Sequence, residues 1–510
     1  MVLPPEAELP VTGLPDLNFS SLFDVHRWSD YPQVNKVCKV VYDDILKQYT
    51  AYREEDEKKL RKQLKVLLID LFANYSADPD LFISISLNKN DYGQKTRYDA
   101  IHLSYRLIKK MITLLSSLGY IEHYIGYLDR ATGIGRVSRI RSSSKLTALF
   151  KGHKLSTVMV KHNPDMETIR LRQRKKEIEY QDNEFTFQSR ANTKRLNIAY
   201  QKTYIDLNVP DALYFQILKH MKDGDPDKKS KKKRWRNGRY VTNYDVVIDF
   251  TRKYLVRIFN DGSLSLGGRF YWSWYQGIPS KYRKYIEING ASIVELDYSG
   301  MHPKMLYANE GLIPPVDPYM LPNFQIEQRG ALKEVLNAMI NMPESKSILK
   351  TICQIIPKRD LPDGYKKSQD LVDAYMEMHK PISHYFHKGY GRNLQFQESL
   401  IAEQVMLKML SWRAVVLPVH DSFIVRAVHL DMLKEAMVDA FVEHTGLDPI
   451  IKKDLTVFDV IESNPNPNLD TLAENIEWYK NLSNGRDPYS LFHGRRTEWY
   501  KHNPMTYQVD

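Results

Sequence analysis

The chain has 510 residues, of which 43% are hydrophobic and 26% charged, and its formal net charge is +11 with a pI near 9.1. This composition predicts a globular protein of about two to four domains and excludes a fibrous or low-complexity one. Two cysteines exclude a disulfide framework, and the lack of a long apolar run or a signal segment predicts a cytoplasmic protein without membrane spans.

Residues 1–150 are predicted to form a mostly helical region, and residues 95–150 have a distinct pattern. Ser104 is a candidate N-cap, an apolar stripe from Ile108 to Leu118 predicts a helix, and Gly119 is a candidate C-cap. Two strands of a basic hairpin are expected at 120–127 and 136–141. A helix followed by such a hairpin resembles a winged-helix module that binds DNA. The alternative is a subdomain that only packs on the rest of the chain.

Residues 151–245 are predicted to be helical and basic, either a thumb-like region or a linker, and Glu167–Glu179 is expected to be a charged helix. Eight of the twelve residues from Lys228 to Arg239 are basic. We expect this run to contact a nucleic-acid backbone, because Trp235 and Tyr240 add stacking surfaces to its cations. The alternative is a solvated linker. The residues proposed for backbone contact are Lys231, Lys232, Lys233, Arg234 and Arg236.

Two later stretches each place an aspartate at the end of a predicted strand. An apolar strand is expected to end at Asp297 and to lead through a Ser-Gly turn into a helix. The stretch from Val415 to Val425 predicts a strand, a polar tip with His420 and Asp421, and a second strand. Two carboxylates on neighbouring strands can hold two divalent cations about 3.5–4 Å apart, the arrangement used for in-line phosphoryl transfer.

The residues around these aspartates resemble a known superfamily. Asp297-Tyr298-Ser299-Gly300 resembles motif A of the family A DNA polymerases, and His420-Asp421-Ser422-Phe423 resembles motif C of the single-subunit phage and mitochondrial RNA polymerases. Gly268-Arg269 followed by Gln276-Gly277-Ile278-Pro279 is similar to the family A stretch that precedes motif A. The resemblance implies an α+β right-hand polymerase with palm, fingers and thumb-like regions, which adds nucleotides to a 3′-hydroxyl.

The resemblance also implies the roles of individual residues. Asp297 and Asp421 would bind two Mg²⁺ ions, with Mn²⁺ as the alternative, and His420 would orient the primer terminus. Contacts to primer and template are expected from Arg269, Gln397 and Glu398. Contacts to the nucleotide are expected from His302, Tyr298 and Ser299, and from a helix with Arg329, Lys333, Asn337 and Asn341 at every fourth position.

Two departures from the family pattern leave the substrate open. Asn337 and Asn341 stand where motif B has aromatic residues, and His302 stands five positions after Asp297, where the DNA polymerases have a glutamate that crowds the ribose 2′-hydroxyl. A bulky imidazole can also exclude ribose, which favours deoxynucleotides. The alternatives are an RNA polymerase or primase, and a DNA-binding replication or regulatory protein with a degenerate core.

The predicted domain order follows from these motifs. The expected partners are a DNA primer–template and nucleoside triphosphates, with RNA as an alternative to DNA; the sequence predicts no oligomeric state. The expected boundaries are 1–150 for the N-terminal region, 151–245 for the thumb-like region, 246–325 for the first palm segment with motif A, 326–393 for the fingers-like insertion with motif B, 394–465 for the second palm segment with motif C, and 466–510 for a tail.

Overall fold

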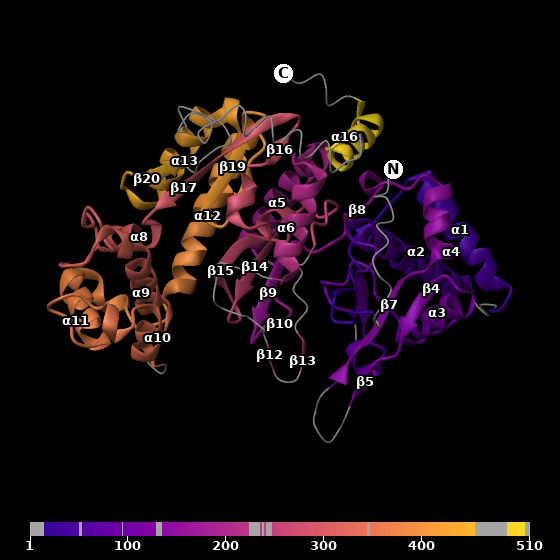
Figure 1. The fold of residues 1–510 in the computed structure, drawn as a ribbon, viewed down its shortest axis with the longest axis horizontal. Helices are drawn as coiled ribbons and strands as arrows, with labels where there is room; N and C mark the ends of the chain where they lie inside the picture. The colour runs from indigo at the N-terminus through magenta and orange to yellow at the C-terminus, as the bar shows by residue number, and fades with distance from the viewer. Residues whose placement is uncertain are drawn as a thin grey trace.

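The computed structural model describes residues 15–49, 54–93, 95–128, 135–223, 235–236, 239–240, 247–343, 347–453 and 487–504. Helices and strands are mixed along the whole chain. In Figure 1 the N-terminal part lies on one side of a central group of strands and long helices, and the helices of residues 301–378 lie on the other. Within these ranges, no helix combines the length and the apolarity needed to cross a membrane.

The N-terminal part builds its own hydrophobic core from helices and a four-stranded sheet. The sheet has the order β1-β3-β7-β4, in which β1 and β3 are parallel and the other pairs antiparallel. The region expected to be mostly helical therefore contains a sheet, because its strands are short and some of them pair with strands far away in the sequence, as β1 does with β3. The elements are β1 Ser20–Leu22, β2 Arg27–Trp28, α1 Pro32–Leu46, α2 Glu54–Ala77, β3 Phe82–Ile85, α3 Tyr105–Ser117, β4 Ile121–Tyr124, β5 Tyr127–Leu128, β6 Gly135–Arg136, β7 Ser138–Ser142, α4 Ser144–Gly152 and β8 Lys161–His162.

The predicted helix and hairpin are confirmed as α3 followed by β4 and β7. Helix α3 buries the apolar stripe that includes Ile108, Met111 and Leu115, and it leaves Arg106, Lys109 and Lys110 exposed. Gly119 follows the helix with φ of +73°, a conformation that glycine adopts without strain. The basic side chains are thus free of the core, as contact with a polyanion requires.

The segment expected to be a helix at Glu167–Glu179 forms two strands instead. The four-stranded sheet β10-β9-β14-β15 contains β9 Ile169–Gln173, β10 Lys176–Glu177, β14 Val256–Asn260 and β15 Ser263–Tyr271. Ile169 and Leu171 alternate with Arg170 and Arg172 along β9, and β9 pairs in parallel with β14. The charge density of this segment suggested a helix, but pairing with a strand some 90 residues away decides its conformation.

A six-stranded sheet carries the two aspartates singled out in the sequence. Its order is β11-β16-β17-β19-β18, and β20 also pairs with β17. Its strands are β11 Ile205–Leu207, β16 Ile286–Ile288, β17 Ala291–Ser299, β18 Leu417–Val419, β19 Ser422–Arg426 and β20 Ile450–Lys453. Strand β17 is longer than expected, since it continues two residues beyond Asp297 to Ser299 and leads through Gly300 into a helix. Asp297 therefore lies within strand β17, where pairing with the neighbouring strands holds it, and not in the turn.

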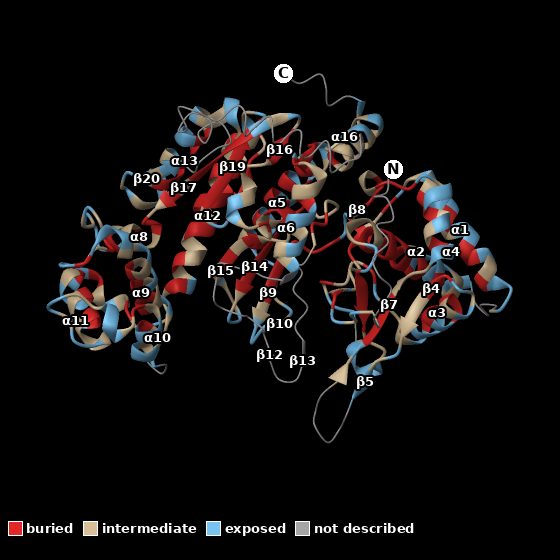
Figure 2. Ribbon diagram, viewed as in Figure 1, coloured by how far each residue is buried: buried red, intermediate tan, exposed pale blue. Residues whose placement is uncertain are grey.

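Long helices cover these sheets and connect them. Helix α12 (Gly391–Ser411) buries about half of its residues, red in Figure 2, and packs against β15 and against α13 (Leu430–Thr445). The largest hydrophobic core extends from the six-stranded sheet through α12 into the helices of residues 301–378. The remaining helices and hairpin strands are α5 Glu184–Lys202, α6 Asp211–Asp223, β12 Trp235–Arg236, β13 Arg239–Tyr240, α7 Ser280–Arg283, α8 Met301–Asn309, α9 Arg329–Asn341, α10 Ile348–Ile355, α11 Ser368–Met378, α12 Gly391–Ser411, α13 Leu430–Thr445 and α16 Ser490–His502.

Buried ion pairs join the N-terminal part to the rest of the molecule. The Arg27 guanidinium lies 2.8 Å from a carboxylate oxygen of Asp70 on α2 and 2.7 Å from one of Asp249. The Nη1 atom of Arg27 donates a hydrogen bond to the Thr251 hydroxyl. Because a buried charge is costly to leave unpaired, these contacts hold the two parts in one orientation.

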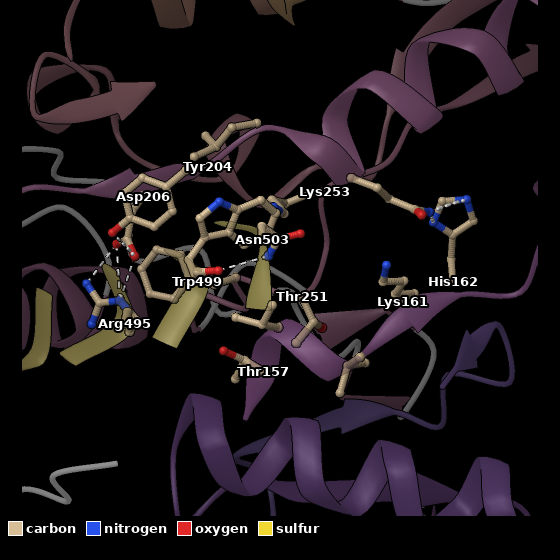
Figure 3. Close-up of a pocket in the computed structure, with 15 residues that line it drawn as sticks. Thr157, Lys161, His162, Tyr204, Asp206, Thr251, Lys253, Arg495, Trp499 and Asn503 are labelled. Atoms are coloured by element: carbon tan, nitrogen blue, oxygen red, sulfur yellow. Dashed lines mark hydrogen bonds and ion pairs between the residues drawn. The ribbon is translucent and has the colours of Figure 1, made fainter. Parts of the chain in front are cut away.

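Helix α16 is the last helix of the described residues, and it lies beside α6 and β11. Figure 3 shows Arg495 of this helix paired with Asp206, and Trp499 lying against Lys253. The Lys253 ammonium lies 3.6 Å from the centre of the Trp499 ring and donates a hydrogen bond to the Thr203 carbonyl. Burial lowers the pKa of Lys253 to about 7. The pocket here has a volume of about 50 Å³, room for water rather than for a substrate.

Candidate active site at the β17–β19 pair

The antiparallel pairing of β17 and β19 brings Asp297 and Asp421 together. Asp297 lies opposite Ser422, and the Tyr298 backbone N–H donates a 3.5 Å hydrogen bond to the carbonyl of Asp421. Both carboxylates also lie close enough to the Tyr319 hydroxyl to raise its pKa, so the two aspartates face one site. Both residues are half-buried. The structure thus joins two aspartates that are 124 residues apart in the sequence.

A two-residue turn between β18 and β19 presents His420 and Asp421 at its tip. Val419 pairs with Ser422, which leaves only these two residues in the turn. His420 has φ of +61°, a left-handed conformation that costs a non-glycine residue free energy and is often found at functional sites. Its ring stands 5.7 Å from that of Tyr271, and burial, followed by the nearby Arg269 cation, lowers the pKa of His420. The lowered pKa favours the neutral form of the imidazole beside Asp421.

Three charged or polar side chains from distant elements form a chain beside the aspartates. One oxygen of the Glu398 carboxylate on α12 accepts hydrogen bonds from Arg269 of β15 and from His302 of α8, the latter at 2.9 Å. The Glu398 side chain is 1% exposed, whereas Arg269 and His302 are 18% and 17% exposed. Burial raises the pKa of Glu398, but the bonds to His302 and Arg269 outweigh it and lower the pKa overall. Glu398 is therefore an anion that holds both neighbours in place.

Arg269 also interacts electrostatically with Asp421 in the β18–β19 turn. Burial lowers the pKa of Arg269, but the Glu398 carboxylate, with smaller contributions from Tyr271 and Asp421, raises it overall. The Asp421 carboxylate therefore interacts electrostatically with the Arg269–Glu398 pair. A fixed guanidinium fork at this position can bind a phosphate or a base edge presented to the two aspartates.

The backbone around Arg269 requires glycine. Gly267 and Gly268 have φ of +84° and +78°, and a Cβ at Gly268 would lie 2.8 Å from the Ser399 hydroxyl oxygen of α12. The close approach allows the fully buried Arg257 guanidinium to contact Glu403 at 2.7 Å and Ser399 at 2.8 Å, while its Nε–H donates to the Gly268 carbonyl. This network fixes α12 against β15 and so sets the position of Glu398 relative to Arg269.

Helix α9 supplies the cations expected for a triphosphate. Arg329 forms an ion pair of 2.6 Å with Asp317, and its guanidinium lies 5.0 Å from the centre of the Tyr319 ring. The Lys333 ammonium lies 5.9 Å from the same ring. Burial raises the pKa of Tyr319 to about 12, with Arg329 opposing and Asp421 and Asp297 adding to the rise. Tyr319 therefore connects the cations of α9 with the two aspartates.

Asn337 and Asn341 are further along α9 and contact each other. The Asn341 amide donates a 2.7 Å hydrogen bond to the Asn337 carbonyl. At the start of α12, a Cβ on Gly391 would lie 1.6 Å from the Asn341 side-chain oxygen, so glycine is needed for the two helices to meet. The two asparagines thus lie where the helices converge, and Asn341 is turned toward its own helix.

Of the remaining predicted site residues, Tyr298 is turned away from the aspartates. Tyr298 is 2% exposed and its hydroxyl donates to the Met437 carbonyl, so its side chain faces the core, opposite to Asp297. The expectation that Tyr298 contacts a nucleotide is wrong, because side chains alternate along a strand. Ser299 lies two residues after Asp297, on the same face of β17, and pairs with Ile450 of β20. Gln397 is half-buried and donates to Asn309 at 3.4 Å. The side chains of the basic run, including Lys231–Arg234 and Arg236, lie outside the described residues.

Sequence reasoning missed a buried carboxylate next to Asp297. Glu295 accepts two hydrogen bonds from Arg283, at 2.9 and 2.7 Å, and one from Ser422 at 2.6 Å. It lies two residues before Asp297 and therefore on the same face of β17. That spacing was a visible signal, but only the pairing with β19 shows that Ser422 reaches across to it. Asp317 and Tyr319 were also missed, since no motif includes them.

The donor set at this site suits a cation that keeps part of its water shell. Within the described residues, no group of three or more His, Cys, Asp or Glu side chains is arranged to enclose a metal ion. Mg²⁺ is commonly held by one or two carboxylates together with substrate phosphates, and not by a cage of protein ligands. Asp297 and Asp421 fit that requirement.

No protein-family model matches the chain, and no curated protein matches it. Among solved structures, the POL domain of Pol1 from M. smegmatis, in complex with a DNA primer-template and dNTP, matches at 10% sequence identity with a TM-score of 0.28. The match covers 84% of this chain and 66% of that chain, so this chain spans just under two thirds of its length. A TM-score this low does not establish a shared fold, and the function must be inferred from the site itself.

Proposed function

We propose that the chain is a nucleic-acid polymerase that adds nucleotides to a 3′-hydroxyl, with Asp297 and Asp421 as the ligands of two Mg²⁺ ions. The observation that carries this proposal is their juxtaposition at the β17–β19 pair, close to the Arg269–Glu398–His302 chain and, through Tyr319, to the cations of α9. In this assignment the six-stranded sheet forms the palm, and helices α9–α11 form the fingers. Bound at this pair, the metal ions would lower the pKa of the attacking hydroxyl and stabilise the leaving pyrophosphate.

The protein's own side chains act on the two substrates. Lys333 and Arg329 approach the site from α9, and their charges compensate the triphosphate of the incoming nucleotide. Arg329 is paired with Asp317, so it exchanges one anion for another when the nucleotide binds. Arg269 and His420 lie close to Asp421 and to each other, and in this proposal they orient the strand that supplies the hydroxyl.

Deoxynucleotides are the favoured substrates, because His302 is held in one orientation by Glu398. A side chain fixed by a buried partner fills space reliably, as exclusion of a ribose 2′-hydroxyl requires. The second candidate is an RNA polymerase or primase, which is favoured by the Ser422-Phe423 pair that follows Asp421.

The test is primer extension with dNTPs and rNTPs in parallel, for wild type, Asp297→Ala and Asp421→Ala. We expect each substitution to reduce incorporation by at least about 1,000-fold, because several kcal/mol of transition-state stabilisation is lost. Asp373→Ala, an exposed aspartate on α11, is the matched control and should retain full activity. Full activity in either active-site variant would exclude the proposed assignment. Inactivity of the wild type with both nucleotide pools would favour a DNA-binding protein with a degenerate core.

A further inference from the structure

A cavity of about 700 Å³ lies between the N-terminal part and residues 271–277 at and after the end of β15, with Arg170 and Arg172 of β9 also in its lining. We call it the interdomain cavity; its lining includes Asp24, His26, Arg170, Trp272, Trp274 and His420. A volume of this size is typical of a pocket for one small organic ligand and is too small for a duplex. Its lining includes His420, the neighbour of Asp421, so it adjoins the proposed catalytic centre.

The loop between β1 and β2 lines the cavity on the side of the N-terminal part, with residues 22–26. Arg27, the next residue, is fixed to Asp70 and Asp249 by buried ion pairs. This side of the cavity is therefore held in place by the same contacts that join the two parts of the molecule. A long product duplex cannot extend through it unless those buried pairs are broken.

Aromatic and cationic groups form another side. The Trp272 ring lies 4.2 Å from the Arg170 guanidinium and 6.0 Å from the His26 ring. Trp272 has φ of +91°, a conformation that bulky residues seldom adopt and that persists only where the surroundings enforce it. Tyr271, its neighbour, stands 5.7 Å from His420. Aromatic rings that can stack on a base therefore extend from Trp272 through Tyr271 toward His420.

The walls also contain polar groups that are suited to a nucleotide. Burial lowers the pKa of His26 to about 4, so its ring is neutral. Its Nε2 faces an Arg170 nitrogen at 3.0 Å, and since arginine only donates, Nε2 must accept and Nδ1 must carry the hydrogen. This Nδ1–H and the Trp274 indole N–H have no partner among the described residues, although side chains cover them in this conformation. Small movements of the wall would make two donors available.

The charges of the cavity leave one arginine for an anion. Asp24 and Asp249 are paired with Arg27 and Arg252, and Glu177 contacts Arg170 at 2.7 Å. Arg172 lies 3.6 Å from that same Glu177 oxygen and its side chain is 32% exposed. Arg172 therefore shares a carboxylate that is already engaged, and a phosphate can compete for it.

We infer that the interdomain cavity binds a single nucleoside triphosphate, which supplies the first 3′-hydroxyl so that synthesis begins without a primer. Its base would stack on the Trp272–Tyr271 side, its 5′-phosphates would pair with Arg172, and its sugar would face His420 and Asp421. This inference presupposes the polymerase activity proposed above. The 3′-oxygen forms a bond to the α-phosphorus of the second nucleotide, the bond from that phosphorus to the β-phosphate oxygen breaks, pyrophosphate leaves, and the hydroxyl proton passes to water.

The first test compares primer-free dinucleotide synthesis with extension of an annealed primer on the same template. In the full chain, Trp272→Ala and Arg172→Gln should each lower primer-free synthesis at least tenfold more than primed extension, through a higher KM for the first nucleotide. Trp272→Phe should recover part of the loss, and Trp28→Ala, in the N-terminal part, is the matched control. Equal effects on both reactions would overturn the inference, as would a wild type that extends primers but makes no dinucleotide.

The second test does not depend on polymerase activity. Binding of ATP and GTP is measured by calorimetry without divalent ions. Under this condition no metal ion bridges the phosphates to the two aspartates, so binding at the aspartates is weakest. We expect the affinity of wild type to fall about tenfold in Trp272→Ala and in Arg172→Gln, and to stay the same in Trp28→Ala. Unchanged affinity in both cavity variants would overturn the inference even if primer extension is normal. Conversely, this binding with no polymerase activity would show that the proposed function, and with it the initiating role, is wrong.

Discussion

Replacement of Glu398 by glutamine tests whether the buried chain beside the aspartates exists in solution. Glutamine keeps the shape of the side chain but removes the charge that Arg269 and His302 both contact. Loss of one partner from a buried ion pair costs about 3–5 kcal/mol. Arg269 remains 18% exposed and keeps the field of Asp421, so we expect the lower end, about 3 kcal/mol less free energy of unfolding.

The pH dependence of this difference has a definite sign. The folded-state pKa of Glu398 is lowered, so its contribution to stability is complete above the unfolded pKa near 4.5 and is lost as the pH falls through the folded value. The difference between wild type and Glu398→Gln should therefore be full at pH 7 and should shrink below about pH 4.

The measurement is urea-induced unfolding followed by circular dichroism, with comparable slopes required for all variants. Glu334→Gln is the matched control, since Glu334 is exposed on α9, and its effect should stay within about 0.5 kcal/mol. Arg269→Met combined with Glu398→Met should recover much of the loss, because apolar side chains of similar size can replace a buried pair. A loss below about 1 kcal/mol in Glu398→Gln, or one that persists unchanged at pH 3, would refute the reasoning.

Three further changes probe other parts of the molecule. His302→Ala should raise the kcat/KM ratio of rNTP over dNTP about tenfold, or 1.4 kcal/mol, since it removes the imidazole that Glu398 holds; an unchanged ratio would place sugar selection elsewhere. Serine in place of the cations from Lys228 to Arg239 should weaken binding to all DNA sequences alike and flatten the slope of log affinity against log salt; an unchanged slope would identify the run as a linker. Lys253→Met should stabilise the protein most below pH 7, because wild type then buries a cation, and this advantage should shrink by about 3 kcal/mol as the pH rises toward 10; a constant difference in urea unfolding would mean that the folded pKa of Lys253 is ordinary.

Local pattern in the sequence determined several features by itself. The apolar stripe of α3, its glycine end and the following hairpin were predictable, because each depends on residues within a few turns of one another. The same holds for α9 and for the two stretches that carry Asp297 and Asp421. Alternation along a strand also implies that Tyr298 cannot face the same side as Asp297, so that error was avoidable from the sequence.

Only the tertiary structure decided which polar groups meet. Arg269, His302 and Glu398 come from three elements, with up to 129 residues between partners, and no local pattern encodes their shared hydrogen bonds. Ser422 reaches Glu295 through the register of β17 and β19, and β9 is a strand because β14 is available to pair with it. Local periodicity depends on backbone geometry, which the sequence shows directly. The partner of a buried charge depends on how distant elements pack, and that packing is settled by the whole core at once.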